Sequence, residues 1–222
     1  MTEAFVSDIE IKILSGEWQE GMIVPSLREL SAIYGVSRSV VNAGIVELQN
    51  KGFLKTYPRK YSVVADWKKC GNLSAIECII EHETYDQLFI DNILDARMTI
   101  ECTAARDAAK KRDDKDLAEI SEILLREKLA VTIDQRTAAD IDFHHAIAIA
   151  SHNMVYPLLL KSFDVLVKKL VTCFYQNNSD REFVTQQHHI IYKAICDNKP
   201  TVAEDTMYIL LRHGEDIVKK TY

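Results

Sequence analysis

Apolar residues in the first fifty positions recur at helical spacing in three short runs. Ser26 precedes the second run and is followed three positions later by Glu29, which is the Ser-x-x-Glu pattern of a capping box. The second run breaks at Gly35, and Ser37 precedes the third run, which ends near Gly52. Two short helices joined by a glycine-containing turn predict a helix-turn-helix. The apolar positions expected to face its core are Phe5, Ile9, Ile13, Leu14, Leu27, Leu30, Ile33, Val40, Val41, Ile45 and Leu48.

Alternating apolar and polar residues come next, in "GFLKTY" and "KYSVVADW" on either side of "PRK". A period of two residues predicts two short strands, and the tight connection predicts a hairpin. Three helices followed by a hairpin form a winged helix. We therefore expect a winged helix-turn-helix domain over residues 1–69.

From about residue 72 the apolar pattern becomes helical and remains so to the end of the sequence. Glycine almost disappears, since Gly71 and Gly214 are the only two after Gly52. Pro157 and Pro200 stand where they suit the first turn of a helix. The predicted fold class is mostly α, with a winged helix-turn-helix of three helices and a small β-hairpin. We expect an all-α bundle of about six helices to follow over residues 72–222.

Composition narrows the class of protein. Hydrophobic residues make up 47% of the chain and charged residues 27%, a balance that favours a packed core over disorder. No apolar run approaches the roughly 20 residues that cross a bilayer, and the first residues lack the basic cluster of a signal peptide. The 5 cysteines are scattered without a CxxC pair, which favours free thiols in a reducing compartment. We expect a cytoplasmic protein with no membrane partner.

Charge is distributed unevenly along the chain. The formal net charge is −6, yet residues 1–69 hold nine basic and eight acidic residues, whereas residues 70–222 hold eighteen basic and twenty-five acidic residues. Within residues 26–60, six basic residues stand against two acidic ones. An acidic body with a basic region at the predicted helix-turn-helix is compatible with local contact to phosphate groups.

The third helical run begins with polar residues. In a helix-turn-helix that binds DNA, the N-terminal end of the second helix is the end that enters the major groove. Arg38 can bind a guanine edge or a phosphate, and Asn42 can bind an adenine edge. The hydroxyls of Ser37 and Ser39 can bind phosphate at the helix N-terminus. With Arg28 on the preceding helix and the basic hairpin tip, the residues predicted to contact double-stranded DNA are Arg28, Ser37, Arg38, Ser39, Asn42, Arg59 and Lys60. The alternative is a winged helix that contacts only protein.

The stretches "PSLREL", "YGVSRSVVNAG" and "LQNKGFLKT" resemble the DNA-binding region of the GntR family of bacterial transcription regulators. The resemblance implies DNA contact by Arg28, Ser37, Arg38 and Ser39. The sequence departs from the family at two points. Asn42 stands where the family usually has arginine, which bears on operator preference. The hairpin tip "YPRKYS" lacks the customary pair of glycines, which bears on the path of the wing.

The stretch "DIDFHHAIAIASHN" places Asp140 and His144 four residues apart, and therefore on one face of a helix. A carboxylate and an imidazole at that spacing can bind one divalent ion, and His188 and His213 on later helices could complete the set. Such ligands suit zinc, nickel or manganese. Two alternatives remain: Asp140 caps or pairs while the histidines are scattered, or the metal serves an enzyme.

The helical part resembles the FCD ligand-binding domain of the FadR subfamily within the GntR family. The marks of this resemblance are "ARMTIECTAARDAA", "DIDFHHAIAIASHN" and "HHIIYKAI". The resemblance implies that Asp140, His144 and His188 bind a metal, which helps to hold a small carboxylate effector. The family's final histidine would fall at Leu210, and the nearest histidine is His213, one turn further along.

Arg97 belongs to the Arg-x-x-x-Glu mark of the same resemblance. It is a candidate to bind the effector's carboxylate, because a guanidinium group can donate two parallel hydrogen bonds to it. The alternative is a salt bridge to Glu101 at helical spacing. We expect a transcription regulator, a repressor by the family's default, that binds a pseudo-palindromic operator as a homodimer. A small organic acid would control this binding by favouring one arrangement of the dimer.

Overall fold

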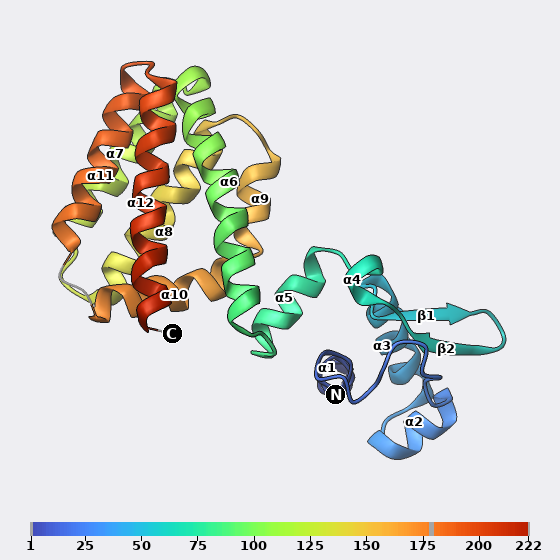
Figure 1. The fold of residues 1–222 in the computed structure, drawn as a ribbon. Coiled ribbons are helices and arrows are strands. Elements are labelled where there is room, and N and C mark those ends of the chain that lie inside the picture. The colour runs from blue at the N-terminus through green and yellow to red at the C-terminus, as the bar shows by residue number, and fades with distance from the viewer. Residues whose placement is uncertain (1, 178–179, 222) are drawn as a thin grey trace. The chain divides into compact units, whose positions relative to one another are not determined.

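The computed structural model describes residues 2–177 and 180–221. Its internal contacts divide the chain into two compact units, Met1–Tyr85 and Asp86–Tyr222, each with its own hydrophobic core (Figure 1). Helices dominate both units, and the described residues contain one two-stranded sheet. The predicted fold class, a winged helix-turn-helix followed by an all-α part, is confirmed. Within the described ranges, no helix combines the length and the apolar character needed to span a bilayer.

The first unit is a winged helix with a short helical extension. Its two strands pair antiparallel from Leu54 opposite Val64 to Tyr57 opposite Tyr61. The hairpin follows three helices directly, as the periodicity predicts. The elements are α1 (Thr2–Leu14), α2 (Leu27–Tyr34), α3 (Arg38–Asn50), β1 (Leu54–Tyr57), β2 (Tyr61–Val64), α4 (Trp67–Cys70) and α5 (Leu73–Glu81).

Local capping fixes the helix-turn-helix. The Ser26 hydroxyl accepts a hydrogen bond from the Glu29 backbone N–H, while the Glu29 carboxylate accepts one from the Ser26 N–H. Gly35 ends α2 with φ 63°, a left-handed conformation that costs glycine little. The Ser37 hydroxyl then accepts from the Val40 N–H at the start of α3. The capping box, the glycine turn and the second cap are therefore confirmed.

The inward-facing positions of α2 were predicted only in part. Leu30 is fully buried, but Leu27 is 38% exposed and Ile33 is 66% exposed, so the assignment of these two to the core is wrong. With 3.6 residues per turn, Leu27 and Ile33 lie about 60° to either side of Leu30 around the helix. This eight-residue helix buries only the middle of that arc.

Helices α4 and α5 pack with the first unit. Ala75 and Cys78 of α5 belong to the same core as the winged helix. The contacts place the change of unit after Tyr85. The division expected near residues 69–72 stays a prediction.

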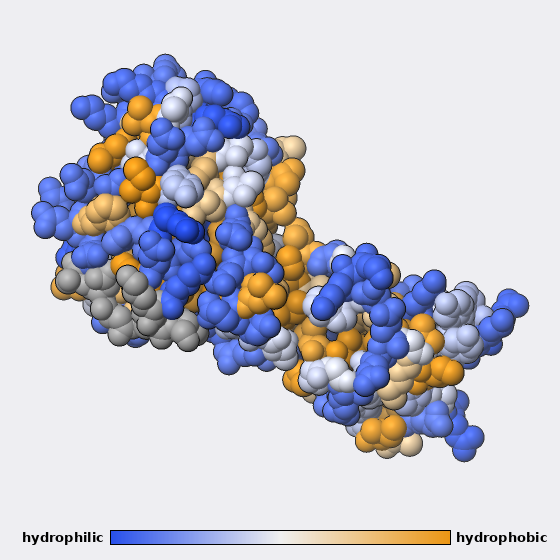
Figure 2. All heavy atoms as spheres, in the orientation of Figure 1, coloured by the Kyte–Doolittle hydropathy of each residue, from blue (hydrophilic) through white to orange (hydrophobic). Residues whose placement is uncertain are grey.

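The second unit is entirely helical over its described residues. The run "MVYPLLLKSFDVLVKKLVTCFYQ", which reads as one helix, is broken at Ser162 and Phe163 into two elements. Figure 2 shows hydrophilic side chains over much of this unit's visible surface, with hydrophobic ones grouped over α9. The elements are α6 (Gln87–Lys111), α7 (Asp114–Leu129), α8 (Ile133–Ala150), α9 (Val155–Lys161), α10 (Asp164–Asn177), α11 (Arg181–Cys196) and α12 (Pro200–Thr221).

Candidate functional site

Helix α3 presents a polar face to solvent and an apolar face to the core. Arg38, Ser39 and Asn42 are exposed in its first turns, whereas Val41, Ile45 and Leu48 are buried on the other side. Gly44 allows α1 to approach closely: a Cβ at that position would lie 2.5 Å from the Phe5 ring. The recognition helix is therefore held by its inner face, and its outer face is free to enter a groove.

The remaining predicted DNA contacts are also exposed. Arg28 lies on α2, and Arg59 and Lys60 form the tip of the hairpin. Arg59 has φ 60°, and the Lys60 N–H donates to the Tyr57 carbonyl at 3.0 Å, which closes a tight turn. Arginine thus occupies a left-handed position that usually favours glycine. The wing path holds without the customary glycines, and it projects two cations.

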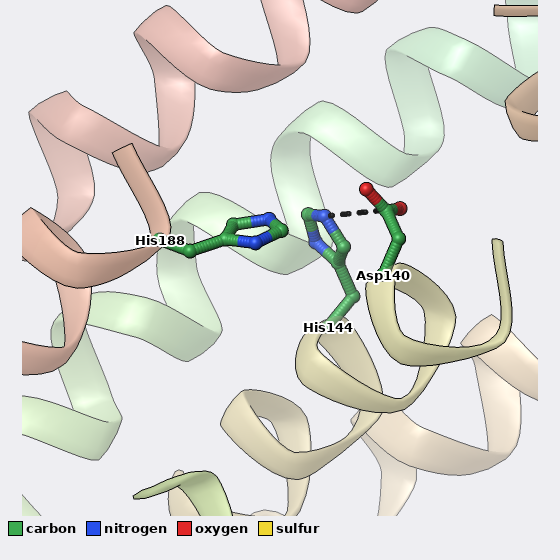
Figure 3. Close-up of side chains that lie close together, drawn as sticks. All are labelled: Asp140, His144 and His188. Carbon is green, nitrogen blue, oxygen red and sulfur yellow. Dashed lines mark ion pairs between the residues drawn. The ribbon is translucent and has the colours of Figure 1, made fainter. Parts of the chain in front are cut away.

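Three candidate ligands converge inside the second unit (Figure 3). Asp140 and His144 come from α8, and His188 points toward them from α11. Each offers a ligand atom within 4.8 Å of the other two, and all three residues are buried. His144 Nε2 lies 3.9 Å from Asp140 Oδ1. The structure brings together the three residues that the sequence singled out first.

Buried carboxylates face the other nitrogen of both imidazoles. His144 turns Nδ1 toward Glu101 Oε2, and His188 Nδ1 lies 3.1 Å from Glu127 Oε2. Thr185 donates its hydroxyl to the second oxygen of Glu127 at 3.0 Å. A carboxylate bound to one imidazole nitrogen fixes the ring and leaves the opposite nitrogen to bind a metal.

The donor set fits a divalent ion. His188 Nε2 is buried, and no described residue forms a hydrogen bond with it. Tyr175 donates its hydroxyl to Asp140 Oδ2 at 3.0 Å, which leaves Oδ1 on the side of His144. Burial raises the pKa of the Tyr175 hydroxyl, with the Asp140 charge adding to it, so this hydroxyl remains a donor. Two imidazole nitrogens and one carboxylate oxygen match the preferences of zinc, nickel or manganese.

Charge in this region centres on Glu101. Its burial opposes ionisation, but the charges of Arg97 and His144 outweigh that effect and lower the pKa of the Glu101 carboxyl to about 2. Burial likewise opposes protonation of His144, but Glu101 outweighs it and raises the pKa of the imidazole. Arg97 Nε donates to Glu101 Oε1 at 2.6 Å. The salt bridge weighed as the alternative role of Arg97 is therefore present.

A cavity adjoins two of the three ligands, Asp140 and His144, and is bordered by α6, α8, α10, α11 and α12. Arg97, Asp140 and His144 line it together with mostly apolar side chains, and Leu210 and His213 line its α12 side. Arg97 thus combines its bond to Glu101 with a place at the cavity wall.

His213 stands apart from the three converging ligands. Its Nε2 lies 3.2 Å from Asp180 Oδ2, and the centroid of its ring lies 4.3 Å from the centroid of the Phe183 ring. Among the described residues, the convergent set consists of Asp140, His144 and His188 without it. Its role as a fourth ligand stays a prediction.

Sequence reasoning missed residues that support the ligands. Glu127 lies 61 positions from His188, and Tyr175 lies 35 positions from Asp140, so no local spacing links either pair. Glu101 was noticed only as a partner of Arg97. A helical pattern shows which face of each helix is apolar, but it does not show which facing helix supplies a buried partner.

A winged helix with an exposed polar recognition face, followed by a helical unit with a cavity, defines a ligand-responsive DNA-binding protein. Comparison with known families makes this specific. Residues 2–64 match the family described as "Bacterial regulatory proteins, gntR family", and residues 92–213 match the family described as "FCD domain". The chain belongs to the GntR family of bacterial transcription regulators, in the group that carries an FCD domain.

Similar proteins agree with this assignment. The chain is 26% identical over 206 residues to the fatty acid metabolism regulator protein of Proteus mirabilis, covering 92% of this chain and 83% of that protein. It is 27% identical over 209 residues to the protein of the same name from Klebsiella pneumoniae, with the same coverage. These relatives are regulators rather than enzymes, so the prediction that the chain is not an enzyme is confirmed.

Solved structures share the fold. Streptococcus agalactiae GntR matches with a TM-score of 0.51 at 19% identity, over 99% of this chain and 100% of that one. A Listeria monocytogenes protein, Lar, described as controlling expression of the agr system, matches with a TM-score of 0.60 at 14% identity. That match covers 100% of this chain and 98% of that one.

Proposed function

We propose that this regulator binds a pseudo-palindromic operator as a homodimer, and that a small organic acid bound with a divalent metal controls that binding. The observation that carries the second half of the proposal is the convergence of Asp140, His144 and His188. Both imidazoles have one nitrogen held by a buried carboxylate, and the second nitrogen of His188 has no hydrogen-bond partner among the residues that the structure describes. Such an arrangement is costly for a purely structural core.

On the DNA side, Arg28, Ser37, Arg38, Ser39 and Asn42 would contact the major groove and its phosphates. Arg59 and Lys60 would contact the backbone or minor groove from the wing. The exposure of all seven side chains supports these roles. Base discrimination would come from Arg38 and Asn42, since both lie in the first turns of the recognition helix and offer paired groups to a base edge.

On the effector side, the metal would supply positive charge that attracts a carboxylate. With Asp140, His144 and His188 as its protein ligands, coordination positions remain for oxygen atoms of the effector. Arg97 borders the same cavity, and the donors of its guanidinium other than Nε would bind the effector's carboxylate. If His213 were to join as a fourth ligand, fewer positions would remain.

Effector binding would change operator affinity by favouring one conformation of the dimer, because a ligand shifts an equilibrium by its differential affinity for the two states. We propose repression that the effector relieves. In this scheme the acidic second unit never contacts DNA itself. It sets the fraction of the protein that can do so.

The test begins with a selection of bound duplexes from a random pool by the full-length protein. Affinity for the selected duplex is then measured by fluorescence anisotropy over a range of salt concentrations. We expect sequence-specific binding that weakens linearly on a log–log salt plot. Absence of sequence preference would refute the operator assignment.

The effector assignment is tested on the same duplex. A panel of small organic acids is added with zinc or manganese and, separately, with a chelator. We expect at least one acid to change operator affinity by about five-fold or more, in the range typical of allosteric coupling, and only when metal is present. Acids that act equally well in chelator would remove the metal from the proposal.

A further inference from the structure

The segment of residues 66–82, which contains α4 and α5, lies outside both family matches, since these cover residues 2–64 and 92–213. It nevertheless contacts Asn50 and Gly52 at the C-terminal end of the recognition helix α3, and it is joined to Lys51 between them through Glu10 of α1. We call residues 66–82 the latch segment. The contacts are all internal to the first unit, Met1–Tyr85.

Two of these contacts involve the backbone. Asn72 Nδ2 donates to the Asn50 carbonyl at 2.9 Å, which satisfies one of the free carbonyls at the end of α3. At Gly52, with φ 84°, an added Cβ would lie only 2.2 Å from the Cys70 carbonyl oxygen. The latch segment therefore lies so close to this helix end that any residue other than glycine at position 52 would clash with it.

The third contact passes through a buried carboxylate on α1. Glu10 is 3% exposed. Lys51 Nζ lies 2.8 Å from Glu10 Oε1, to which Cys78 also donates at 3.4 Å, and His82 Nε2 lies 2.8 Å from Glu10 Oε2. One carboxylate thus joins the end of α3 to both Cys78 and His82 of the latch segment.

The charges around Glu10 keep it ionised. Burial raises its pKa, but hydrogen bonds from His82 and Lys51 outweigh this effect, and the net pKa of the Glu10 carboxyl is below its ordinary value. Lys51 also pairs with Glu47 on α3 at 2.8 Å. Removing Glu10 would leave Lys51 paired only with the half-exposed Glu47 and His82 without this carboxylate, so the link between α3 and the latch segment would be lost.

We propose that Glu10 and the latch segment are positioning elements for DNA recognition. Glu10 acts through Lys51, and Asn72 acts through the Asn50 carbonyl. A helix is rigid over the 13 residues of α3, so a fixed C-terminal end determines where Arg38 and Asn42 point at the other end. Hydrogen bonds to base edges need close alignment, whereas attraction to phosphate does not. The inference rests on the proposed operator binding.

The test compares three full-length variants with the wild type. Asn72→Ser keeps a side chain that can cap α5 but removes the amide donor to Asn50. Glu10→Gln keeps the size of the side chain but removes its charge. Glu77→Gln makes the same chemical change at an exposed position of α5 and is the matched control. Each variant is measured well below its own melting temperature, on the selected operator and on an unrelated duplex.

We expect Asn72→Ser and Glu10→Gln each to weaken operator binding by about five-fold or more, the effect of one lost hydrogen bond in a recognition geometry. Affinity for the unrelated duplex and the salt dependence should stay within about two-fold, because no phosphate contact is removed. Glu77→Gln should behave as wild type. If Asn72 and Glu10 served only the folding of the protein, the substitutions would weaken binding to both duplexes equally or to neither.

Wild-type operator affinity in both Asn72→Ser and Glu10→Gln would overturn the inference while leaving operator binding intact. Equal weakening on both duplexes would also overturn it. If Glu10→Gln does not fold, the exposed Asn72→Ser decides alone. If the wild type itself selects no sequence, the proposed operator binding is refuted, and the inference about the latch segment, which rests on it, is refuted as well.

Discussion

At the scale of single residues, the histidines differ by what faces their nitrogens. His145 and His152 pair through Nε2 with Asp164 and Asp116 in partly exposed positions. In contrast, His144 and His188 direct Nδ1 to buried carboxylates and leave Nε2 facing the site. The pair Asp140 and His144 could be predicted from a spacing of four. The carboxylates that orient the imidazoles could not be, because they belong to other helices.

The first prediction concerns His188 and its carboxylate partner. His188→Ala should abolish stoichiometric binding of zinc or manganese, because it removes the ligand from α11. Glu127→Gln should lower metal affinity by about 10- to 100-fold, because it no longer fixes the imidazole ring. His189→Ala changes the adjacent, exposed histidine and is the control. Elemental analysis after equilibrium dialysis measures all three. Wild-type protein that retains no metal would contradict the prediction.

The second prediction concerns Arg38 at the start of the recognition helix. Arg38→Ala should weaken binding to the selected operator by roughly 10- to 100-fold, as expected for loss of a two-pronged contact to guanine. The side chain is exposed, so the fold should be unaffected. Arg126→Ala removes an exposed arginine of the second unit as a control. Anisotropy titration measures affinity, and unchanged affinity in Arg38→Ala would contradict the groove assignment.

At the scale of elements, the capping pattern was informative and the apolar pattern less so. Ser26, Glu29, Gly35 and Ser37 set the ends of α2 and α3 by local hydrogen bonds, and these are visible in the sequence. The break between α9 and α10 follows no glycine or proline at that point and was missed. Local chemistry therefore predicted where helices begin and end better than it predicted interruptions imposed by packing.

The third prediction compares two glycines within helices. Replacing glycine by alanine in a helix interior should stabilise it by about 0.5–1 kcal/mol when there is room for the methyl group. At Gly214 in α12, no atom of the described residues lies within 4 Å of an added Cβ, so Gly214→Ala should stabilise the second unit by that amount. At Gly44 the added Cβ would lie 2.5 Å from the buried Phe5 ring. Gly44→Ala should therefore destabilise the first unit by about 1–3 kcal/mol.

Thermal and denaturant unfolding, followed by circular dichroism, measure both changes. The two substitutions share their chemistry, so opposite signs would come from packing alone. Stabilisation by Gly44→Ala would show that Phe5 moves aside at no cost, and it would contradict the close α1–α3 contact. Because the chain has two units, the midpoint of each transition is compared with the wild type separately.

At the scale of the whole molecule, the sequence separates a slightly basic region from an acidic one. Residues 1–69 carry a slight excess of basic residues and residues 70–222 a clear excess of acidic ones, which already divides DNA contact from effector control. The sequence pattern does not show which residues far apart in the chain become partners in the fold. Glu10 meets Lys51 and His82 across 41 and 72 positions. Periodicity marks Glu10 only as a polar interruption of an apolar helix, and nothing local indicates that three elements meet there.

The last prediction follows from the two-fold symmetry of the proposed homodimer. A homodimer that presents two recognition helices fixes both the distance and the rotation between them, so its operator should consist of two half-sites in a set phase. Inserting five base pairs between the half-sites rotates them by about half a helical turn and should weaken binding by at least ten-fold. A single half-site should bind as weakly as the interrupted operator. Anisotropy titration measures the affinities, and analytical ultracentrifugation of the complex should give two chains per duplex. A half-site that binds as tightly as the full operator would contradict the dimer, because one recognition helix would then supply all of the contacts.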